Sequence, residues 1–372
     1  MSWLTLKRAA KMLDSQLIGD DAGFERVSID TRNDSENTLF FSLKGPNFDA
    51  HEILDDEPNL SFSGIVVSRA VKHSAPTILV EDTRQALGQF ASEWRSEYTG
   101  KMIGLTGSNG KTTVKQMLAE IFSQVGDTLS TAGNLNNDIG VPLTLLNLRK
   151  EHRFAVVEMG ANHAGEIAYL TQLVRPEIAL ITNAGPAHLE GFGSVAGVAK
   201  AKAEIFDGLV ADGIAVINAD DRYADDWLTQ NQARTCITFG VTQGADVQVI
   251  NQQPLRLLID QETYEVPLKL IGQHNALNAA AAAAVAIAAQ ISVADIVAGL
   301  SKVTAVKGRL ELKRGPAGSA LIDDTYNANP GSVDAAIIVL SKMSGSRYLV
   351  LGDLAELGAA ANDAHAQIGL DA

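Results

Sequence analysis

The sequence of 372 residues contains a single cysteine, Cys236, so no disulfide can form within the chain. This fits a reducing compartment such as the cytosol. Its most apolar stretch, the alanine-rich segment 278–291, is shorter than the ~20 residues that a membrane-spanning helix needs. The first 16 residues also lack the long apolar core and the cleavage site of a signal peptide. We therefore expect a cytoplasmic protein that does not insert into a membrane.

Basic residues are scarce as well, because 30 Lys and Arg stand against 44 Asp and Glu, giving a net charge of −14. Binding to a nucleic-acid backbone needs clustered Lys and Arg, so nucleic acid is not an expected partner. A phosphorylated small molecule is still compatible with this charge, since one local pocket can oppose the global sign. The length predicts two or three domains of roughly 100–200 residues each.

The spacing of apolar residues predicts an α/β fold in three domains. Residues 1–98 are predicted to form a small N-terminal α/β domain. Residues 99–307 alternate apolar runs with helical patterns, which indicates a central, doubly wound and mostly parallel sheet. Between residues 235 and 266 we expect short antiparallel strands. Residues 308–372 are predicted to begin a Rossmann-like domain, with strands at 320–324 and 348–351, that is truncated at Ala372.

A glycine-rich turn connects a predicted strand, 102–106, to a predicted helix, 111–123. This is the context of a phosphate-binding loop, in which backbone N–H groups and the helix N-terminus face the phosphates. The usual first glycine of the pattern is replaced by Leu105, so the cradle must be built from Gly107 and Gly110. The predicted nucleotide-binding residues of the loop are Thr106, Gly107, Ser108, Asn109, Gly110, Lys111, Thr112 and Thr113.

Two polar residues follow the next predicted strands of the same sheet. Glu158 ends the strand 154–158, and His188 lies in the loop after the strand 178–182. The carboxyl ends of parallel strands line one ligand crevice, so both side chains are expected beside the phosphate loop. A carboxylate there suits Mg²⁺, and a neutral imidazole can also bind metal. Taken singly, Glu158 could be a solvated carboxylate at a strand end, and His188 could be a loop histidine that caps the next helix.

Together these segments resemble the Mur ligase family. The resemblance rests on TGSNGKTT (106–113), GNLNNDIGVPLTLL (133–146), EMGANHAGEI (158–167), TNAGPAHLEGFGS (182–194), AKAEIF (201–206), GQHNALNAAAA (272–282), KGRLE (307–311) and DDTYNANPGSVDAA (323–336). It implies an ATP-dependent ligase that forms an amide through an acyl phosphate. The segments NNDIGVPLTLL and DDTYNANP resemble the member that adds D-alanyl-D-alanine to UDP-N-acetylmuramoyl-tripeptide, in the synthesis of peptidoglycan precursors.

The resemblance also implies roles for individual residues. It assigns Mg²⁺, in two ions, to Thr112, Glu158, His188 and a carbamylated Lys202, and catalysis to Lys111, Lys202, His188 and Glu158. From spacing alone, Lys202 would be an ordinary exposed helix lysine. Further nucleotide contacts are assigned to Asn275, Arg309 and Asp324. The UDP-linked substrate is assigned to Asp30, Thr31, Arg32, Lys44 and Gly45, and contacts near the phosphates and the incoming substrate to Asn134, Asn136 and Asn137.

Two other interpretations stay open at this stage. A sister Mur ligase with a different amino-acid substrate would share most of these motifs. A P-loop nucleotide-binding switch that forms no amide would share the phosphate loop alone, because that loop does not separate classes of enzyme. A monomer that acts on small molecules is expected in either ligase case.

Overall fold

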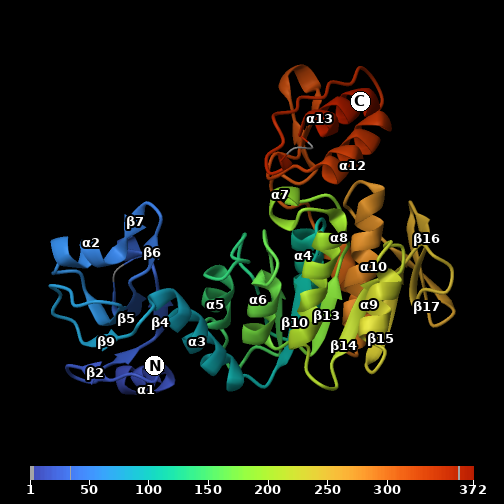
Figure 1. The fold of residues 1–372 in the computed structure, drawn as a ribbon. Helices are drawn as coiled ribbons and strands as arrows, with labels where there is room; N and C mark the ends of the chain where they lie inside the picture. The colour runs from blue at the N-terminus through green and yellow to red at the C-terminus, as the bar shows by residue number, and fades with distance from the viewer. Residues whose placement is uncertain (1–3, 34, 359–360) are drawn as a thin grey trace. The chain divides into compact units, whose positions relative to one another are not determined.

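The computed structural model describes residues 4–33, 35–358 and 361–372 of the chain. Its contacts divide the chain into two compact units (Figure 1), one formed by residues 1–99 and 132–150 and the other by residues 100–131 and 151–372. The segment 132–150 contains helix α5 (Gly140–Leu145), which packs on α3 (Thr83–Ser96). The indole Nε1 of Trp94 donates to the Leu148 carbonyl at 3.1 Å. This segment, which the sequence placed in the central domain, is therefore part of the first unit.

The first unit is built on a five-stranded sheet in the order β2-β9-β8-β5-β4. Neighbours β4 to β9 pair in parallel, and β2 pairs antiparallel with β9. The strands are β2 (Leu17–Ile18), β4 (Arg26–Ser28), β5 (Ser35–Phe41), β8 (Phe62–Val67) and β9 (Thr77–Leu79). The unit also contains α1 (Leu6–Met12), α2 (Ala50–Asp56) and a 3₁₀ turn at Thr31–Asn33. Two separate two-stranded ladders pair β1 (Leu4–Thr5) with β3 (Gly23–Phe24) and β6 (Lys44–Gly45) with β7 (Phe48–Asp49).

Strand β8 is buried at every position, which is typical of a central strand covered on both faces. Phe40 and Ile65 pack with Ala50 and Leu54 of α2 in one cluster. The ring of Phe40 stacks on Phe62 with centroids 4.8 Å apart. Burial of these large side chains, each contributing on the order of 1.5–3 kcal/mol, fixes α2 against the sheet.

The second unit contains a nine-stranded sheet in the order β11-β12-β10-β13-β14-β15-β16-β17-β18. Its strands are parallel from β11 to β16, and the pairs β16–β17 and β17–β18 are antiparallel. The bounds are β10 (Lys101–Thr106), β11 (Thr128–Ser130), β12 (Phe154–Glu158), β13 (Ile178–Ile181), β14 (Ile214–Asn218), β15 (Thr235–Gly240), β16 (Val247–Gln252), β17 (Leu255–Ile259) and β18 (Glu262–Val266). The predicted mostly parallel sheet is confirmed, but the antiparallel part begins only at the β16–β17 pair. The prediction was wrong for β15, which continues the parallel ladder beside β14.

Helices cover this sheet on both faces. On one face α4 (Lys111–Phe122), α10 (Gln273–Ala288) and α11 (Val293–Lys302) pack together on strand residues such as Ile103 and Leu105. In a second group, α6 (Glu166–Val174) contacts β10, and the 3₁₀ turn Glu204–Gly208 contacts β10 and β13. Helix α8 (Val195–Ala203) packs on α6 and on this turn. The short α7 (Leu189–Phe192) precedes α8, and α9 (Ala224–Gln230) packs on β14. Alanine side chains along α10 are almost all fully buried, which lets this helix lie close to α4 and β15.

The last part of the chain continues from this unit. It contains β19 (Glu311–Arg314) and β20 (Ala320–Asp323), which pair antiparallel, with a 3₁₀ turn at Pro316–Gly318 and the helices α12 (Pro330–Ser341) and α13 (Ala361–Asp371). The predicted strand at 348–351 was wrong, because these residues form no strand and pair with no other segment in the described chain. Tyr348 and Val350 are 84% and 94% exposed, so their apolar pattern lacks the partner strand that a ladder requires.

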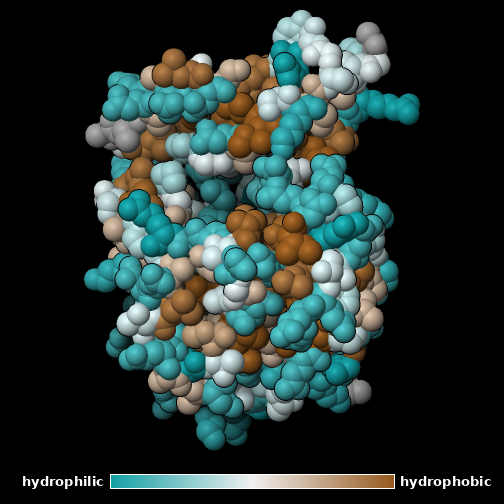
Figure 2. Space-filling model, turned by 90° about the vertical axis from the view of Figure 1, so that its right-hand side faces the viewer, coloured by the Kyte–Doolittle hydropathy of each residue, from teal (hydrophilic) through white to brown (hydrophobic). Residues whose placement is uncertain are grey.

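The surface has both hydrophilic and apolar areas, and the face shown in Figure 2 carries apolar residues in groups among hydrophilic ones. Within the described residues, no helix is both long and apolar enough to cross a membrane.

Candidate active site in the second unit

The phosphate-loop segment lies between β10 and α4, as the sequence predicted. Gly107 and Gly110 have left-handed φ angles of 148° and 83°. A Cβ at Gly107 would lie 1.9 Å from Thr182 Oγ1, and one at Gly110 would lie 2.3 Å from Asn278 Oδ1. Both positions therefore require glycine for conformation and for space. Leu105 is fully buried in β10, so the first glycine of the usual pattern has no place in this loop.

Hydrogen bonds with the residues that follow β13, the neighbour of β10 in the sheet, stabilise the conformation of the loop. The Ser108 amide donates to the Asn183 carbonyl at 3.0 Å, and the Asn109 amide donates to Asn183 Oδ1 at 3.0 Å. Thr182 Oγ1 donates to the Asn109 carbonyl at 2.7 Å. The loop is thus preformed in front of the N-terminus of a 12-residue helix, where the helix dipole favours an anion.

Lys111 folds back over this loop. Its Nζ donates to the Gly107 carbonyl at 2.6 Å and to the Ser108 carbonyl at 3.2 Å. Burial lowers the pKa of Lys111, Glu158 opposes that shift, and Arg309 adds to it. A phosphate group would replace the two carbonyls with a full negative charge, so the ammonium is placed to receive one.

Glu158 is the carboxylate at the centre of the site. It ends β12 and is 1% exposed. Its Oε1 lies 3.4 Å from the Thr112 hydroxyl, and its Oε2 lies 3.1 Å from Lys115 Nζ. The sequence reasoning missed Lys115, although its position four residues after Lys111 puts it on the same side of α4. Lys115 thus contacts this carboxylate directly, and Lys111 is close enough for Glu158 to raise its pKa. Two cations near one carboxylate are compatible with binding of a highly charged anion.

His188 lies at the same edge of the sheet, in the loop after β13. It has a left-handed backbone, with a φ of 51°, and its Nδ1 is hydrogen bonded to Glu356 Oε2. Burial lowers the pKa of His188; Glu356 opposes this shift, while Lys111 and Lys202 add to it. The histidine is thus close enough to both lysines for their charges to lower its pKa, while its metal and catalytic roles stay predictions.

Lys202 differs most from its sequence-based description as an exposed helix lysine. It lies in α8, is 1% exposed, and has its Nζ 5.3 Å from the centroid of the Phe192 ring and 3.5 Å from the Ala161 carbonyl. Burial, with a further contribution from Lys111, lowers the pKa of Lys202 to about 7. Near neutral pH a large part of this amine is therefore uncharged and able to act as a nucleophile.

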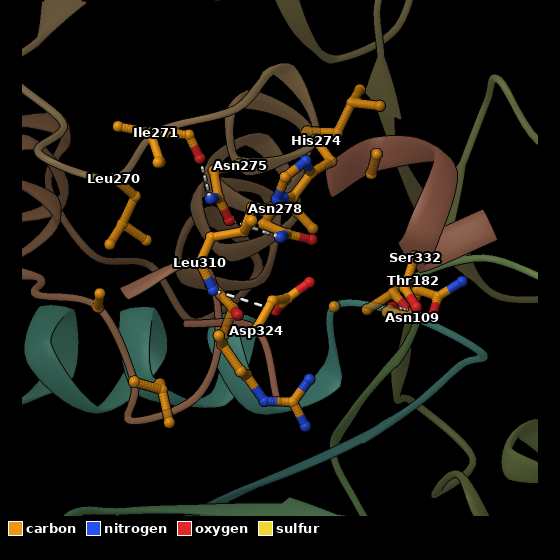
Figure 3. Close-up of a pocket in the computed structure, with 18 of the residues that line it drawn as sticks. Asn109, Thr182, Leu270, Ile271, His274, Asn275, Asn278, Leu310, Asp324 and Ser332 are labelled. Atoms are coloured by element: carbon orange, nitrogen blue, oxygen red, sulfur yellow. Dashed lines mark hydrogen bonds between the residues drawn. The ribbon is translucent and has the colours of Figure 1, made fainter. Parts of the chain in front are cut away.

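A cavity of about 540 Å³ opens beside the phosphate loop (Figure 3). Polar side chains from the start of α10 and from the segment after β20 face into it. Asn275 Nδ2 donates to the Ile271 carbonyl at 2.6 Å, Asn278 Nδ2 donates to Asn275 Oδ1 at 3.0 Å, and the Leu310 amide donates to Asp324 Oδ1 at 3.0 Å. The predicted residues Asn109, Gly110, Thr113, Asn275, Arg309 and Asp324 all line this cavity.

The cavity fits a nucleotide in its chemistry. Phe239, Leu270 and Ile271 supply apolar surface, and the asparagines supply donors and acceptors. Arg309 Nη2 lies 3.2 Å from the Thr112 hydroxyl, and its buried Nε has no hydrogen-bond partner among the described residues. Burial raises the pKa of Asp324. The sequence reasoning missed His274, Asn278 and Phe239 in this lining, although His274 and Asn278 flank the predicted Asn275 on one helix.

The remaining predicted residues belong to the first unit. Asp30, Thr31 and Arg32 follow β4, while Lys44 and Gly45 form β6. Arg32 donates twice to Asp30, at 2.9 Å and 2.8 Å. Asn137 Oδ1 accepts from the amide of Gly140, the first residue of α5, at 2.9 Å, and the Asn136 amide donates to the Asn134 carbonyl at 2.7 Å. The substrate roles of these residues stay predictions.

Comparison with known proteins agrees with this geometry. The model of the Mur ligase middle domain matches residues 105–286, and that of the Mur ligase glutamate ligase domain matches residues 308–372. The UDP-N-acetylmuramoyl-tripeptide--D-alanyl-D-alanine ligase of Escherichia coli is 44% identical over 98% of this chain and 82% of its own length. The chain belongs to the Mur ligase family.

Solved structures of MurF proteins are similar to the structure of this Mur ligase. MurF from Acinetobacter baumannii matches 100% of the chain and 83% of its own length, with a TM-score of 0.93 and 37% identity. MurF ligase from Thermotoga maritima, solved in complex with ADP, covers 93% of the chain and 82% of its own length, with a TM-score of 0.83 and 28% identity. The multidomain α/β fold is therefore confirmed as that of a Mur ligase.

Proposed function

We propose that this Mur ligase uses ATP to join D-alanyl-D-alanine to UDP-N-acetylmuramoyl-tripeptide in peptidoglycan precursor synthesis. The observation that carries the choice of substrates is the 44% identity, over 98% of the chain, to the E. coli ligase of that name. The use of ATP is supported by the preformed phosphate loop, by the adjoining cavity, and by the ADP complex of the Thermotoga relative.

The reaction proceeds in two steps. The terminal carboxylate of the tripeptide first attacks the γ-phosphorus, so that a C–O–P bond forms, the bond to the β-phosphate oxygen breaks, and ADP leaves. The dipeptide amine then attacks the acyl carbon, phosphate leaves from the tetrahedral intermediate, and the amine loses a proton. Phosphoryl transfer depends mainly on positioning and charge neutralisation. Lys111, the loop amides and Arg309 are the groups of this chain that supply both.

Magnesium fits the donors beside the loop. The Thr112 hydroxyl and the Glu158 carboxylate are hard oxygen ligands of the kind Mg²⁺ prefers. The described residues contain no cluster of three or more His, Cys, Asp or Glu side chains, so phosphate and water oxygens would complete its coordination. We assign a second ion to His188 and Lys202. Bound metal would neutralise charge on the transferring phosphoryl group.

Carbamylation of Lys202 is the second part of this proposal. A neutral buried amine can attack CO₂ to form a C–N bond, giving an anionic carbamate and a proton. This replaces an ammonium, which would repel a divalent cation, with an oxygen ligand. The pKa of Lys202, about 7, supports this chemistry because the amine is partly uncharged at neutral pH.

The UDP-linked substrate is assigned to the first unit. The proposed domain bounds are 1–98, 99–307 and 308–372, with residues 132–150 of the central span packed in the first unit. A monomer and a cytoplasmic location, where ATP is available, also belong to it. Three small-molecule substrates suffice for this reaction, and no nucleic acid or membrane takes part in it.

One assay tests the function. Phosphate release is measured with ATP, UDP-N-acetylmuramoyl-tripeptide and, separately, D-alanyl-D-alanine, meso-diaminopimelate or lysine. We expect release only when the nucleotide-linked peptide and D-alanyl-D-alanine are both present. Release with another amine instead would identify a sister ligase, and release that ignores both acceptors would identify a nucleotide switch.

A further inference from the structure

The sheet of the first unit also has polar residues beyond the carboxyl ends of neighbouring strands. Strands β4, β5 and β8 are neighbours and run parallel. Arg32 lies just beyond β4, Lys44 just beyond β5, and Ser68 immediately beyond β8. Because carboxyl ends of parallel strands meet at one edge of a sheet, these residues follow strands that end at the same edge. Two cations and a hydroxyl at such an edge suit a diphosphate.

A buried histidine connects two of these groups. His51 lies in the first turn of α2 and is 2% exposed. Its Nδ1 is 2.6 Å from Asp49 Oδ1, and its Nε2 lies 2.9 Å from the Ser68 amide nitrogen and 3.2 Å from Ser68 Oγ. Asp49 Oδ2 lies 3.4 Å from the ammonium of Lys44. One imidazole therefore links the residues that follow β5 and β8.

These contacts fix the state of the ring. A backbone amide can only donate, so Nε2 must accept from Ser68 and carries no proton. The proton then sits on Nδ1, where it is donated to Asp49. Burial alone would raise the pKa of Asp49, but hydrogen bonds from His51 outweigh it and the net shift is downward. Asp49 thus stays a carboxylate that can hold Lys44.

The arrangement resembles a Ser-His-Asp triad but does not work as one. A general base needs a free lone pair facing the serine hydroxyl. Here the Ser68 amide occupies that lone pair at 2.9 Å, while the hydroxyl is farther away at 3.2 Å. The ring is therefore used to hold neighbouring groups in place, and Ser68 is not activated as a nucleophile.

We propose that His51 is a positioning residue for the diphosphate of the UDP-linked substrate, acting on Lys44 through Asp49 and on Ser68 through its backbone amide. The inference deepens the proposed function and rests on its assignment of the UDP moiety to this unit. The exposed lysine, whose side chain is 73% accessible, would otherwise move freely. Holding it in one geometry lowers the entropy lost when the diphosphate binds.

The test is the dissociation constant for UDP and for UDP-N-acetylmuramoyl-tripeptide, measured by calorimetry. We expect His51→Ala to weaken binding of both about 10-fold, the effect of losing a charge-assisted contact. His51→Asn keeps an amide donor for Asp49 and should lose only about 3-fold by the same reasoning. Ser68→Ala removes the exposed hydroxyl without disturbing the core and should weaken binding several-fold. The KM for ATP should not change in any of these variants.

His73→Asn is the matched control. This partly buried histidine of the same unit also accepts a backbone amide, from Ala75 at 3.1 Å, and bonds to the Leu60 carbonyl at 3.0 Å, but it has no link to Lys44. The thermal stability of the His73→Asn variant should fall as in the His51 variants, and its dissociation constant for UDP should be unchanged. Equal weakening of UDP binding in His73→Asn and His51→Ala would show a general loss of structure and overturn the inference.

A double-mutant cycle separates this inference from the proposed function. If His51 acts through Lys44, the effects of His51→Ala and Lys44→Ala must be less than additive. Additive effects, or a Lys44 effect without a His51 effect, would overturn the positioning role and leave the UDP site intact. If Lys44→Ala, Arg32→Ala and His51→Ala all leave UDP binding unchanged, the diphosphate binds elsewhere and both assignments fail.

Discussion

Both units present cations at the carboxyl edge of a parallel sheet, but they hold those cations in opposite ways. In the first unit Arg32 and Lys44 are exposed, with side chains 88% and 73% accessible, and each is paired with its own carboxylate. In the second unit Lys115 and Lys202 are buried, and Lys115 shares Glu158 with the loop threonine.

The difference between the two edges matches their proposed functions, which are binding of the substrate in the first unit and reaction in the second. The Asp30–Arg32 hydrogen bonds lower the pKa of Asp30 to about 2 and raise that of Arg32, so this exposed pair stays ionised at physiological pH. Such a pair can bind an anion without a change in its protonation. Desolvation and a neighbouring cation lower the pKa of the half-buried Lys111 and of the buried Lys202. Perturbed groups of this kind are typical of reacting sites.

The sharpest way to break the comparison is to remove Lys111. Lys111→Ala should lower kcat by about 1000-fold or more, because a positioned cation on the transferring phosphoryl group is lost from a preorganised site. Phosphate release with both acceptor substrates measures this. Lys101→Ala, which alters an exposed lysine at the start of β10, the strand that precedes the loop, is the control. Full activity in the Lys111 variant would refute its role.

Lys202→Ala should have the next largest effect, lowering kcat on the order of 100-fold as a metal ligand is lost. Short carboxylates such as acetate should restore part of the rate by replacing the carbamate oxygens. Lys200→Ala, an exposed lysine of the same helix, should behave as the unaltered protein. A Lys202 variant with the normal rate would remove the carbamate from the mechanism.

The same residue predicts a pH dependence. Only the neutral amine reacts with CO₂, and the pKa of Lys202 is about 7. The neutral fraction therefore rises through pH 7, and one unit below the pKa it is about a tenth. Activity after equilibration at pH 6 should fall and recover on adding bicarbonate, whereas activity at pH 8 should be insensitive to it. A stimulation by bicarbonate that increases from pH 6 to pH 8 would contradict this prediction.

These contrasts also mark the limit of what the sequence could predict. The phosphate loop was predictable because an apolar strand, two glycines and a lysine are adjacent in the chain. Burial of Lys202 was not, because it depends on Phe192 and on the strand order that brings α8 to the sheet edge. The link between Lys115 and Glu158 likewise requires β12 to lie beside β10. The false strand at 348–351 shows the converse, since a local apolar pattern cannot report whether a partner strand exists.

Asp324→Ala tests the nucleotide cavity and should raise the KM for ATP about 10-fold with little change in kcat, since the residue contributes binding and no chemistry. Its Oδ1 accepts from the Leu310 amide within the cavity lining. The adjacent Asp323 bonds instead to Thr325 and Lys313 and is not part of that lining, so Asp323→Asn is a matched control. An unchanged KM in the Asp324 variant would move the nucleotide contact elsewhere in the cavity.

The smallest effect is expected at the exposed sheet edge of the first unit. Its dependence on salt concentration distinguishes the exposed cations from the buried ones. Arg32→Ala should raise the KM for UDP-N-acetylmuramoyl-tripeptide several-fold and leave the KM for ATP unchanged. Because the Arg32 side chain is 88% exposed, its contribution should fall between low salt and 0.5 M NaCl, where the Debye length is only about 4 Å. Arg8→Ala, which removes another exposed ion pair of the same unit, with Glu97, should leave both KM values unchanged.

The buried cluster around Lys111 is screened far less, so the Lys111→Ala defect should persist at high salt. Equal salt sensitivity of the two variants would mean that the exposed and buried edges bind their anions by the same physics.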